Sequence, residues 1–217
     1  NPLTKKEAAH LFKVINSGIK LTKDVEVVIC PPYIYLSGFK FKTLNFILGA
    51  QDCYWEQKGA FTGEVSPLML KNLGCQYVIV GHSERRKYFG ETEEIINKKI
   101  KAALKARLKP ILCLGEETRD TFDSDGRPTN EINLVIQEQL ERAVFGISSS
   151  RINDVIIVYE PVWAISSNNG VSRLPDEAMR AKLFIKKILS KLYNRRTAEE
   201  AKILYGGSVT AKTSSDY

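Results

Sequence analysis

Six short apolar runs recur along the chain, and each is followed by a segment with a helical pattern. The runs occupy residues 25–30, 45–50, 77–80, 110–114, 155–159 and 202–205. Because they are almost continuously apolar and rich in β-branched residues, we expect strands of a parallel sheet that are buried on both faces. Strands that alternate with helices predict an α/β fold, either a doubly wound sheet or a barrel.

Polar capping residues predict where the helices begin. Thr4 with Glu7 forms a capping-box pattern, Ser66 precedes Pro67, and Thr92 precedes another apolar stripe. Two later helices are expected to begin at Thr129 or Asn130 and at Pro175, and Gly74 is expected to close the helix that Ser66 opens. The faces expected to point inward are Ala8, Leu11, Phe12 and Ile15; Ile95, Ile96, Ile100 and Leu104; Ile132, Val135, Ile136 and Leu140; and Met179, Leu183, Phe184 and Ile188.

Composition narrows the class of protein. The chain has 217 residues, 43% of them hydrophobic, which suits a single domain spanning residues 1–217. No apolar run approaches the roughly 20 residues that a membrane helix needs, so we expect no membrane segment and a cytoplasmic location. The net charge of +7 comes from lysines interleaved with acids along the helices, which predicts solvated faces and no nucleic-acid partner.

The positions of the cysteines and glycines argue against a cysteine metal site and against a dinucleotide-binding sheet. The four cysteines, Cys30, Cys53, Cys75 and Cys113, follow no metal-ligand spacing, and we expect them to be reduced. No Gly-x-Gly-x-x-Gly motif follows the first strand, which disfavours a dinucleotide-binding sheet.

The residues that follow the predicted strands carry the chemistry. Glu160 stands at the exit of a buried strand, directly before Pro161, and other exits present His82, Glu116 and the turn at 206–208. In parallel barrels such exits form the active site. One histidine, several carboxylates and a Gly-Gly-Ser turn suit proton transfer on a phosphorylated substrate.

Three of these exits carry motifs that resemble those of the triosephosphate isomerase family. They are Gly-His-Ser-Glu-Arg-Arg at 81–86, Tyr-Glu-Pro-Val-Trp-Ala-Ile at 159–165 and Tyr-Gly-Gly-Ser-Val at 205–209. The segment 59–64 resembles the family's dimerisation loop, and 30–32 and 112–116 also match. The resemblance covers nearly the whole chain in the same order, and it implies a (β/α)8 TIM barrel, of which this chain carries about strands 2–7.

The resemblance implies roles for individual side chains. Glu160 is the base that removes a proton from the carbon beside the substrate carbonyl. His82 is the neutral electrophile that donates a hydrogen bond to the carbonyl oxygen, and Glu84 orients groups beneath the substrate. His10 is assigned no function, and Cys113 is expected to pack beside the base.

The remaining implied residues bind phosphate, move the lid or hold a partner subunit. Backbone N–H groups of Gly206, Gly207 and Ser208, with Ser166 at the lid tip, are expected to bind the phosphate, because glycines let the backbone approach an anion closely. The hinge of the lid is Pro161, Val162 and Trp163. Phe61, Thr62 and Gly63 belong to a loop that inserts into a second copy, which implies a homodimer.

The sequence departs from the family pattern at several places. The lid tip, residues 166–174, is longer by about two residues and lacks its first glycines, and Asp52 stands where an amide is usual. The family's first strand with its Asn and Lys, and its eighth strand, have no counterpart here. A barrel without them has two open edges, and we expect this chain on its own to be unstable or inactive.

The resemblance therefore predicts an isomerase that interconverts D-glyceraldehyde 3-phosphate and dihydroxyacetone phosphate in glycolysis and gluconeogenesis, without a metal or organic cofactor. A phosphosugar epimerase or an aldolase is an alternative, although an aldolase needs a Schiff-base lysine at a strand exit, and none of these exits has one. A second alternative is a catalytically impaired phosphate-binding paralogue or an inactive fragment, favoured by the altered lid tip and the missing lysine.

Overall fold

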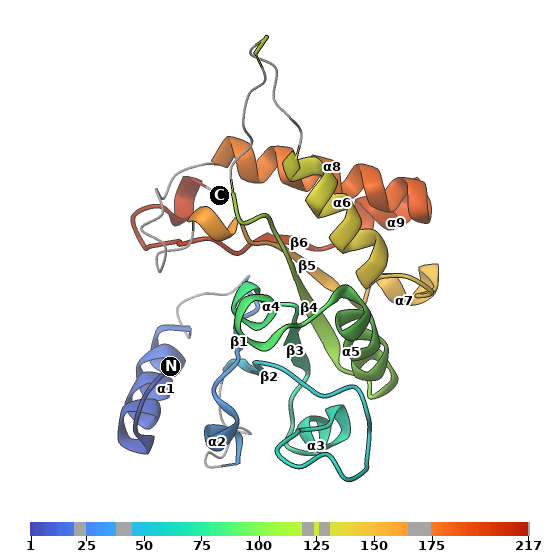
Figure 1. Cartoon of the computed structure of the whole chain (residues 1–217). Helices are drawn as coiled ribbons and strands as arrows, with labels where there is room; N and C mark the ends of the chain where they lie inside the picture. Colours follow the sequence, from blue (N-terminus) through green and yellow to red (C-terminus); the bar gives the residue numbers. More distant parts are fainter. Residues whose placement is uncertain (20–24, 38–44, 119–123, 126–130, 165–174, 217) are drawn as a thin grey trace. The chain divides into compact units, whose positions relative to one another are not determined.

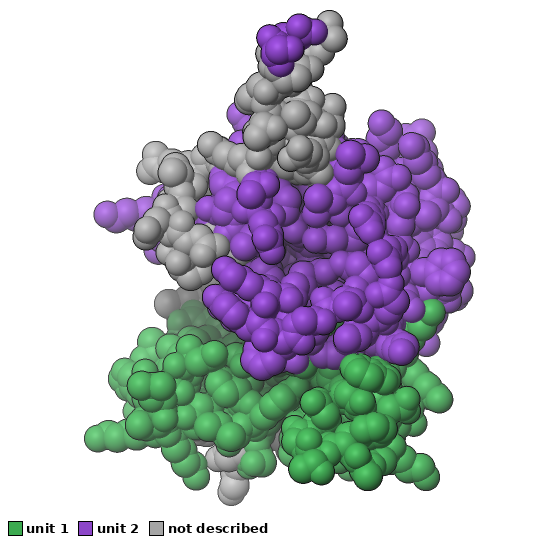
Figure 2. Space-filling model, in the orientation of Figure 1, with its two compact units in different colours: residues 1–80, 101–110 green, residues 81–100, 111–217 purple. Residues whose placement is uncertain are grey.

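The computed structural model describes residues 1–19, 25–37, 45–118, 124–125, 131–164 and 175–216 (Figure 1). The chain packs into two compact units, coloured separately in Figure 2. Unit 1 comprises residues 1–80 and 101–110, and unit 2 comprises residues 81–100 and 111–217. That residues 1–217 form a single domain stays a prediction.

Unit 1 contains three parallel strands with helices between them. Its strands are β1 (Val28–Ile29), β2 (Ile47–Ala50) and β3 (Tyr77–Val80), and its helices are α1 (Lys5–Ile19), α2 (Tyr33–Leu36) and α3 (Pro67–Asn72). β2 pairs with β1 and with β3, with Val28 opposite Ile47 and Gly49 opposite Tyr77. Ala8 and Phe12 of α1 form an apolar cluster with Tyr35 and Phe46.

Unit 2 repeats this alternation with longer helices. Its strands are β4 (Lys109–Leu114, which begins in unit 1), β5 (Ile156–Tyr159) and β6 (Ile203–Tyr205). Its helices are α4 (Ser83–Phe89), α5 (Glu93–Lys105, which ends in unit 1), α6 (Glu131–Ala143), α7 (Ser149–Ile152), α8 (Pro175–Leu192) and α9 (Arg195–Glu200), with the short 3-10 helices η2 (Val162–Ala164) and η4 (Ser214–Asp216). β5 lies between β4 and β6, parallel to both, and α8 packs against β5, α6 and α9.

The structure confirms all six predicted strands and their parallel direction within each unit. The first is the least complete, since only Val28 and Ile29 of the run 25–30 form a strand. Ser66 caps α3 as predicted, and its hydroxyl accepts a hydrogen bond from the N–H of Met69 at 3.3 Å. Thr129 and Asn130 lie outside the described residues.

Several local predictions were wrong in detail. Leu11 of α1 and Val135 of α6, which were expected to point inward, are 46% and 36% exposed, because other residues of each helix face the packed side.

The Thr4 hydroxyl accepts from the Glu7 N–H, but the Glu7 carboxylate reaches the N–H of Leu3 and not that of Thr4, because Leu3 lies within its reach at 2.8 Å. In α8 the predicted inward residues Met179 and Leu183 are 52% and 60% exposed. The buried stripe is Ala181, Ile185, Ile188 and Leu189, which also follows helical spacing and lies on a neighbouring face of the helix. No described helix is long and apolar enough to cross a membrane.

A buried cluster of charges joins α4 to α5. Glu91, which is 7% exposed, accepts hydrogen bonds from the side chains of Arg85 and Lys99, each at 2.5 Å. Burial alone would raise the pKa of Glu91, but the two cations outweigh it and lower that pKa. Because α4 begins directly after His82, this cluster fixes the helix that presents the histidine.

Asn97 joins α5 to the end of α6. Its amide nitrogen donates to the carbonyl oxygens of Ala143 at 2.8 Å and of Phe145 at 2.9 Å. Both carbonyls lie where the last turn of a helix leaves acceptors without intrahelical partners. The side chain therefore satisfies the α6 end and fixes its position against α5.

We expect Asn97→Asp to destabilise the fold, because it removes both donors and sets a negative charge against two carbonyl oxygens. The loss is about 2 kcal/mol, equivalent to a melting temperature lower by roughly 4–8 °C. Thermal unfolding followed by circular dichroism measures it, with the exposed Lys105→Ala on the same helix as the control. A melting temperature unchanged to within a degree would show that the Asn97 bonds contribute nothing.

Candidate active site

Glu160 extends β5 by one residue and carries the carboxylate predicted to be the base. Its N–H donates to the carbonyl of Leu114 at 2.7 Å, and the N–H of Val162 donates to the carbonyl of Glu116 at 3.0 Å, so pairing with the chain that extends β4 continues past the strand end. The residue is only 5% exposed. A carboxylate held in this way is partly desolvated and fixed in direction, as a general base needs to be.

Glycines on both sides make room for Glu160. A Cβ atom at Gly115 would lie 1.9 Å from the carbonyl oxygen of Glu160, and one at Gly206 would lie 3.3 Å from the Glu160 Cβ and 2.5 Å from a methyl of Val158. The N–H of Gly206 also donates to the carbonyl of Tyr159 at 2.7 Å. Three neighbouring strand ends thus meet at the backbone of Glu160, and only glycine fits at the two flanking positions.

His82 lies directly opposite the carboxylate. Its Nδ1 accepts a hydrogen bond from the N–H of Glu84 at 3.3 Å, which makes His82 the N-cap of α4. Its Nε2 lies 2.9 Å from Oε1 of Glu160, and the N–H of Ser83 donates to Oε2 at 3.2 Å. With Nδ1 occupied as an acceptor, the neutral imidazole carries its proton on Nε2, which faces the site.

Two opposing influences set the protonation of His82. The hydrogen bond to the Glu160 carboxylate raises the pKa of His82 above its usual value, and burial works in the opposite direction. The N–H that Glu84 directs at Nδ1 from a helix N-terminus also favours the neutral ring. The direct bond to Glu160 prevails, and the pKa of His82 is raised.

Glu84 is close to His82 but differs from it in environment. Its side chain is 67% exposed, and its Oε2 lies 3.9 Å from Nδ1 of His82. The backbone N–H of Glu84 makes the closer contact with the histidine. The predicted orienting role of this residue therefore rests more on its backbone than on its carboxylate.

The predicted phosphate turn follows β6, next to Glu160. Gly206, Gly207 and Ser208 are all partly buried. A Cβ at Gly207 would lie 2.1 Å from the hydroxyl oxygen of Tyr205, so a side chain there would have to displace the Tyr205 ring. After Ser208 the chain makes a turn at 211–213 and then forms the 3-10 helix η4. Ser166, the fourth predicted phosphate ligand, lies outside the described residues.

The predicted hinge contacts the buried carboxylate of Glu116. Glu116 lies at a predicted strand exit, but the sequence assigned it no role. Oε1 of Glu116 accepts hydrogen bonds from the hydroxyl of Tyr159 and from the indole N–H of Trp163, both at 2.8 Å. Val162 and Trp163 begin the 3-10 helix η2. Burial raises the pKa of Glu116, and the two donors oppose that rise. Glu116 thereby ties Tyr159 and Trp163 to the chain that follows β4.

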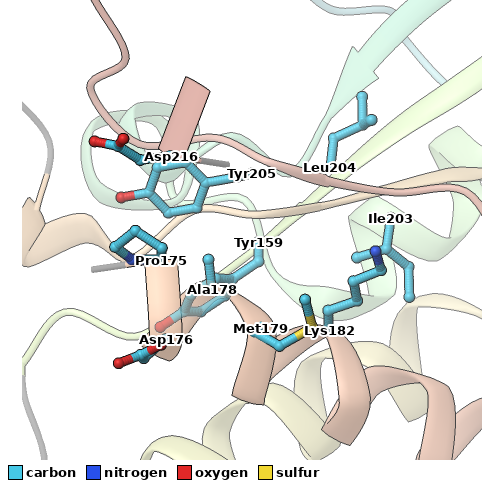
Figure 3. A pocket seen from close by; sticks show the side chains of 10 residues that line it. All are labelled: Tyr159, Pro175, Asp176, Ala178, Met179, Lys182, Ile203, Leu204, Tyr205 and Asp216. Carbon is cyan, nitrogen blue, oxygen red and sulfur yellow. The ribbon is translucent and has the colours of Figure 1, made fainter. Parts of the chain in front are cut away.

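A pocket of about 250 Å³ lies beside the same strands but is not this site. Figure 3 shows its lining side chains, which come from α8, from β6, from Tyr159 and from Asp216. Consecutive residues of an extended chain point to opposite faces, so Tyr159 faces this pocket and Glu160 faces away from it. Neither His82 nor Glu160 lines the pocket.

The other predicted residues lie apart from this cluster in the sequence and belong to unit 1. Asp52 is buried at 5% exposure. Phe61 is 39% exposed, and its ring packs on that of Tyr54 at 4.7 Å between centroids. Thr62 is exposed, and Gly63 has a φ of +91°, which favours glycine at the turn.

The cluster in unit 2 supplies a buried base, a hydrogen-bond donor opposite it and a glycine turn beside both. This set can remove a proton from a carbon next to a carbonyl and stabilise the oxyanion that forms. Among the described residues, no group of three or more His, Cys, Asp or Glu side chains is arranged to hold a metal ion.

Comparison with known proteins agrees with this chemistry. The family model described as triosephosphate isomerase matches residues 2–217. The triosephosphate isomerase of Geobacter metallireducens is 44% identical over 193 residues, which are 88% of this chain and 74% of that protein. Those of Endomicrobium trichonymphae and Dictyoglomus thermophilum are 41% and 40% identical over 215 and 217 residues, in each case 98% of this chain and 82% and 84% of the relative. The chain belongs to the triosephosphate isomerase family.

Proposed function

We propose that this isomerase interconverts D-glyceraldehyde 3-phosphate and dihydroxyacetone phosphate, with Glu160 as the base and His82 as the electrophile. The observation that carries the assignment is the 2.9 Å approach of His82 Nε2 to Glu160 Oε1. It brings the only histidine outside α1 to the buried carboxylate at a strand exit. The family match supports the substrates.

The reaction moves one proton between adjacent carbons. Glu160 takes the proton from the carbon beside the carbonyl, and the electron pair left behind forms an enediolate whose charge lies on the former carbonyl oxygen. The Nε2–H of His82 donates to that oxygen as the charge develops. The proton of the neighbouring hydroxyl group passes to the former carbonyl oxygen, and return of the carbon-bound proton from Glu160 to the neighbouring carbon then gives the isomeric product. Base and donor are both regenerated.

Substrate has to displace the contacts seen in the free site. The Glu160 carboxylate is held by His82 Nε2 and by the Ser83 N–H, so both of its oxygens are engaged. A carbonyl group that accepts from Nε2 replaces one of these bonds and frees the carboxylate to face the adjacent carbon. In the free enzyme His82 and Glu160 are therefore hydrogen-bonded to each other, and substrate binding breaks that bond.

Phosphate binding and lid closure complete the proposal. The N–H groups of the turn at 206–208 would hold the phosphate, as glycine-rich turns do for anions. The Pro161–Trp163 hinge, anchored through Glu116, would let the lid exclude water, with Ser166 at its tip. Glu84 would support the ring of His82.

Partner and location follow from the family. A loop at 59–64 with Phe61 partly exposed supports a homodimer in which Phe61, Thr62 and Gly63 meet a second copy. A role in glycolysis and gluconeogenesis in the cytoplasm is proposed on the same basis. Nothing in the comparisons favours the impaired paralogue.

Substitution of the two reacting side chains tests the assignment. We expect Glu160→Asp to lower kcat by about 100-fold or more. The aspartate side chain is shorter by one methylene group, so its carboxylate lies farther from the substrate carbon. We expect His82→Gln to lower kcat by about 100- to 1,000-fold, as the loss of an oxyanion donor does. A coupled isomerase assay of the enzyme that carries this sequence measures both. His10→Gln, which changes the exposed histidine of α1, is the matched control, and kcat within twofold of wild type in either site variant would reject the role of that residue.

The raised pKa of His82 gives a pH-dependent signature in the free enzyme. Because the folded pKa is raised, the His82–Glu160 bond stabilises the fold fully below the pKa of an unfolded histidine, about 6.5, and loses that contribution as pH rises through the raised value. Glu160→Gln removes the carboxylate and leaves burial, which lowers the pKa.

NMR titration of the imidazole C–H signal of His82 measures this. The midpoint is expected above the usual histidine value of about 6.5 in the wild type and lower in Glu160→Gln. The stability difference between the two proteins should shrink as pH rises through the His82 midpoint. An unchanged midpoint in Glu160→Gln would contradict the bond between the two side chains.

A further inference from the structure

On the edge that faces away from β5, the peptide groups of the chain just after β4 bond to a side chain of unit 2. The carbonyls of Leu114 and Glu116 accept from β5 and its extension. Residues of a paired strand present their N–H and C=O groups to alternate sides, so the peptide groups of Gly115 point to the opposite edge. These two groups need a partner of their own.

The side chain of Gln139, on α6, supplies that partner. Its Oε1 accepts from the N–H of Gly115 at 2.9 Å, and its Nε2 donates to the carbonyl of Gly115 at 3.1 Å. A carboxamide has the acceptor and donor of a peptide group, so Gln139 bonds to both groups of Gly115. A pair of bonds to one residue fixes the orientation of its backbone as well as its position.

Gly115 transmits that orientation to the base. Its backbone is so close to Glu160 that a Cβ there would lie 1.9 Å from the Glu160 carbonyl oxygen and 2.6 Å from the carbonyl carbon. A tilt of Gly115 therefore moves the backbone of Glu160. The two hydrogen bonds of the Gln139 side chain go to Gly115, not to His82 or the Glu160 carboxylate, so its influence on those groups is indirect.

A second side chain holds the next carbonyl on the same edge. Arg86 Nη2 donates to the carbonyl of Cys113 at 3.0 Å, and its Nε donates to that of Gly81 at 2.6 Å. Gly81 directly precedes His82. Side chains from α4 and α6 thus hold successive outward carbonyls of this edge, at Cys113 and Gly115.

We infer that Gln139 is a positioning residue for the catalytic base: it sets the placement of Glu160 through its two hydrogen bonds to Gly115. The inference rests on the proposed role of Glu160. Its consequence is that loss of the Gln139 bonds slows proton abstraction while substrate binding at the glycine turn is kept.

The test compares two variants with a control on the same helix. Gln139→Met keeps the length of the side chain and removes both bonds, and we expect kcat to fall by about 10- to 100-fold with KM within about twofold. The primary isotope effect on kcat with dihydroxyacetone phosphate deuterated at C1 should rise, because proton transfer becomes slower. Gln137→Met is the control, since the Gln137 amide donates to Glu141 within α6 at 2.8 Å; it should leave kcat and the isotope effect unchanged.

The pH dependence of kcat in Gln139→Glu separates a positioning role from a purely structural one. A protonated carboxyl group can accept from the Gly115 N–H and donate to its carbonyl, as the amide does, whereas the ionised form cannot donate. The kcat of this variant, relative to wild type at each pH, should therefore rise as pH falls. If Gln139→Met does not fold, this pH dependence carries the test alone.

Three results would overturn the inference while leaving the isomerase assignment intact. They are a kcat of Gln139→Met within twofold of wild type, an equal fall in kcat and rise in KM, and a flat pH ratio for Gln139→Glu. Failure of the proposed function looks different, since the wild-type enzyme itself would then show no isomerase activity.

Discussion

The close packing of three strand ends around the backbone of Glu160 is the constraint on which the site depends. Gly115 after β4 and Gly206 after β6 leave no room for a side chain beside β5. The ladder bonds of Leu114 and Glu116 then fix Glu160 and Val162 in register. Backbone contacts of the sheet therefore position Glu160, and a carboxylate on a mobile loop would lack this precision.

The charges of the site follow from that placement. Glu160 is buried, and its two oxygens accept from His82 Nε2 and from the Ser83 N–H. The helix that begins at Ser83 supplies the N–H groups that orient His82 and bind the carboxylate. One helix start thus sets the tautomer of His82 and holds both oxygens of the Glu160 carboxylate.

The sequence predicted those features of the site that depend on a local pattern of residues. Continuous apolar runs predicted the six strands, and strand exits predicted Glu160, His82 and the turn at 206–208, because side-chain chemistry follows directly after a buried run. The roles came from the resemblance to a family, and the structure brings His82, Glu160 and Gly206 together in unit 2.

The supporting contacts could not be predicted in this way. Gln139 bonds to a backbone 24 residues earlier, and Arg86 bonds to a carbonyl 27 residues later. Neither carries a motif, since the partner of each is a peptide group that every residue has. The inward face of α8 was misplaced for a related reason: several apolar rows fit a helical period, and only packing decides which row is buried.

The most direct test of this account is the kcat of Gly115→Ala. A methyl group 1.9 Å from the Glu160 carbonyl forces the backbone of the base to move, and we expect kcat to fall by about 100-fold in the folded variant. Gly18→Ala is the control, because a Cβ at Gly18 meets nothing within 4 Å. A folded Gly115→Ala enzyme with kcat within twofold of wild type would contradict the claim that the packed strand ends place the base.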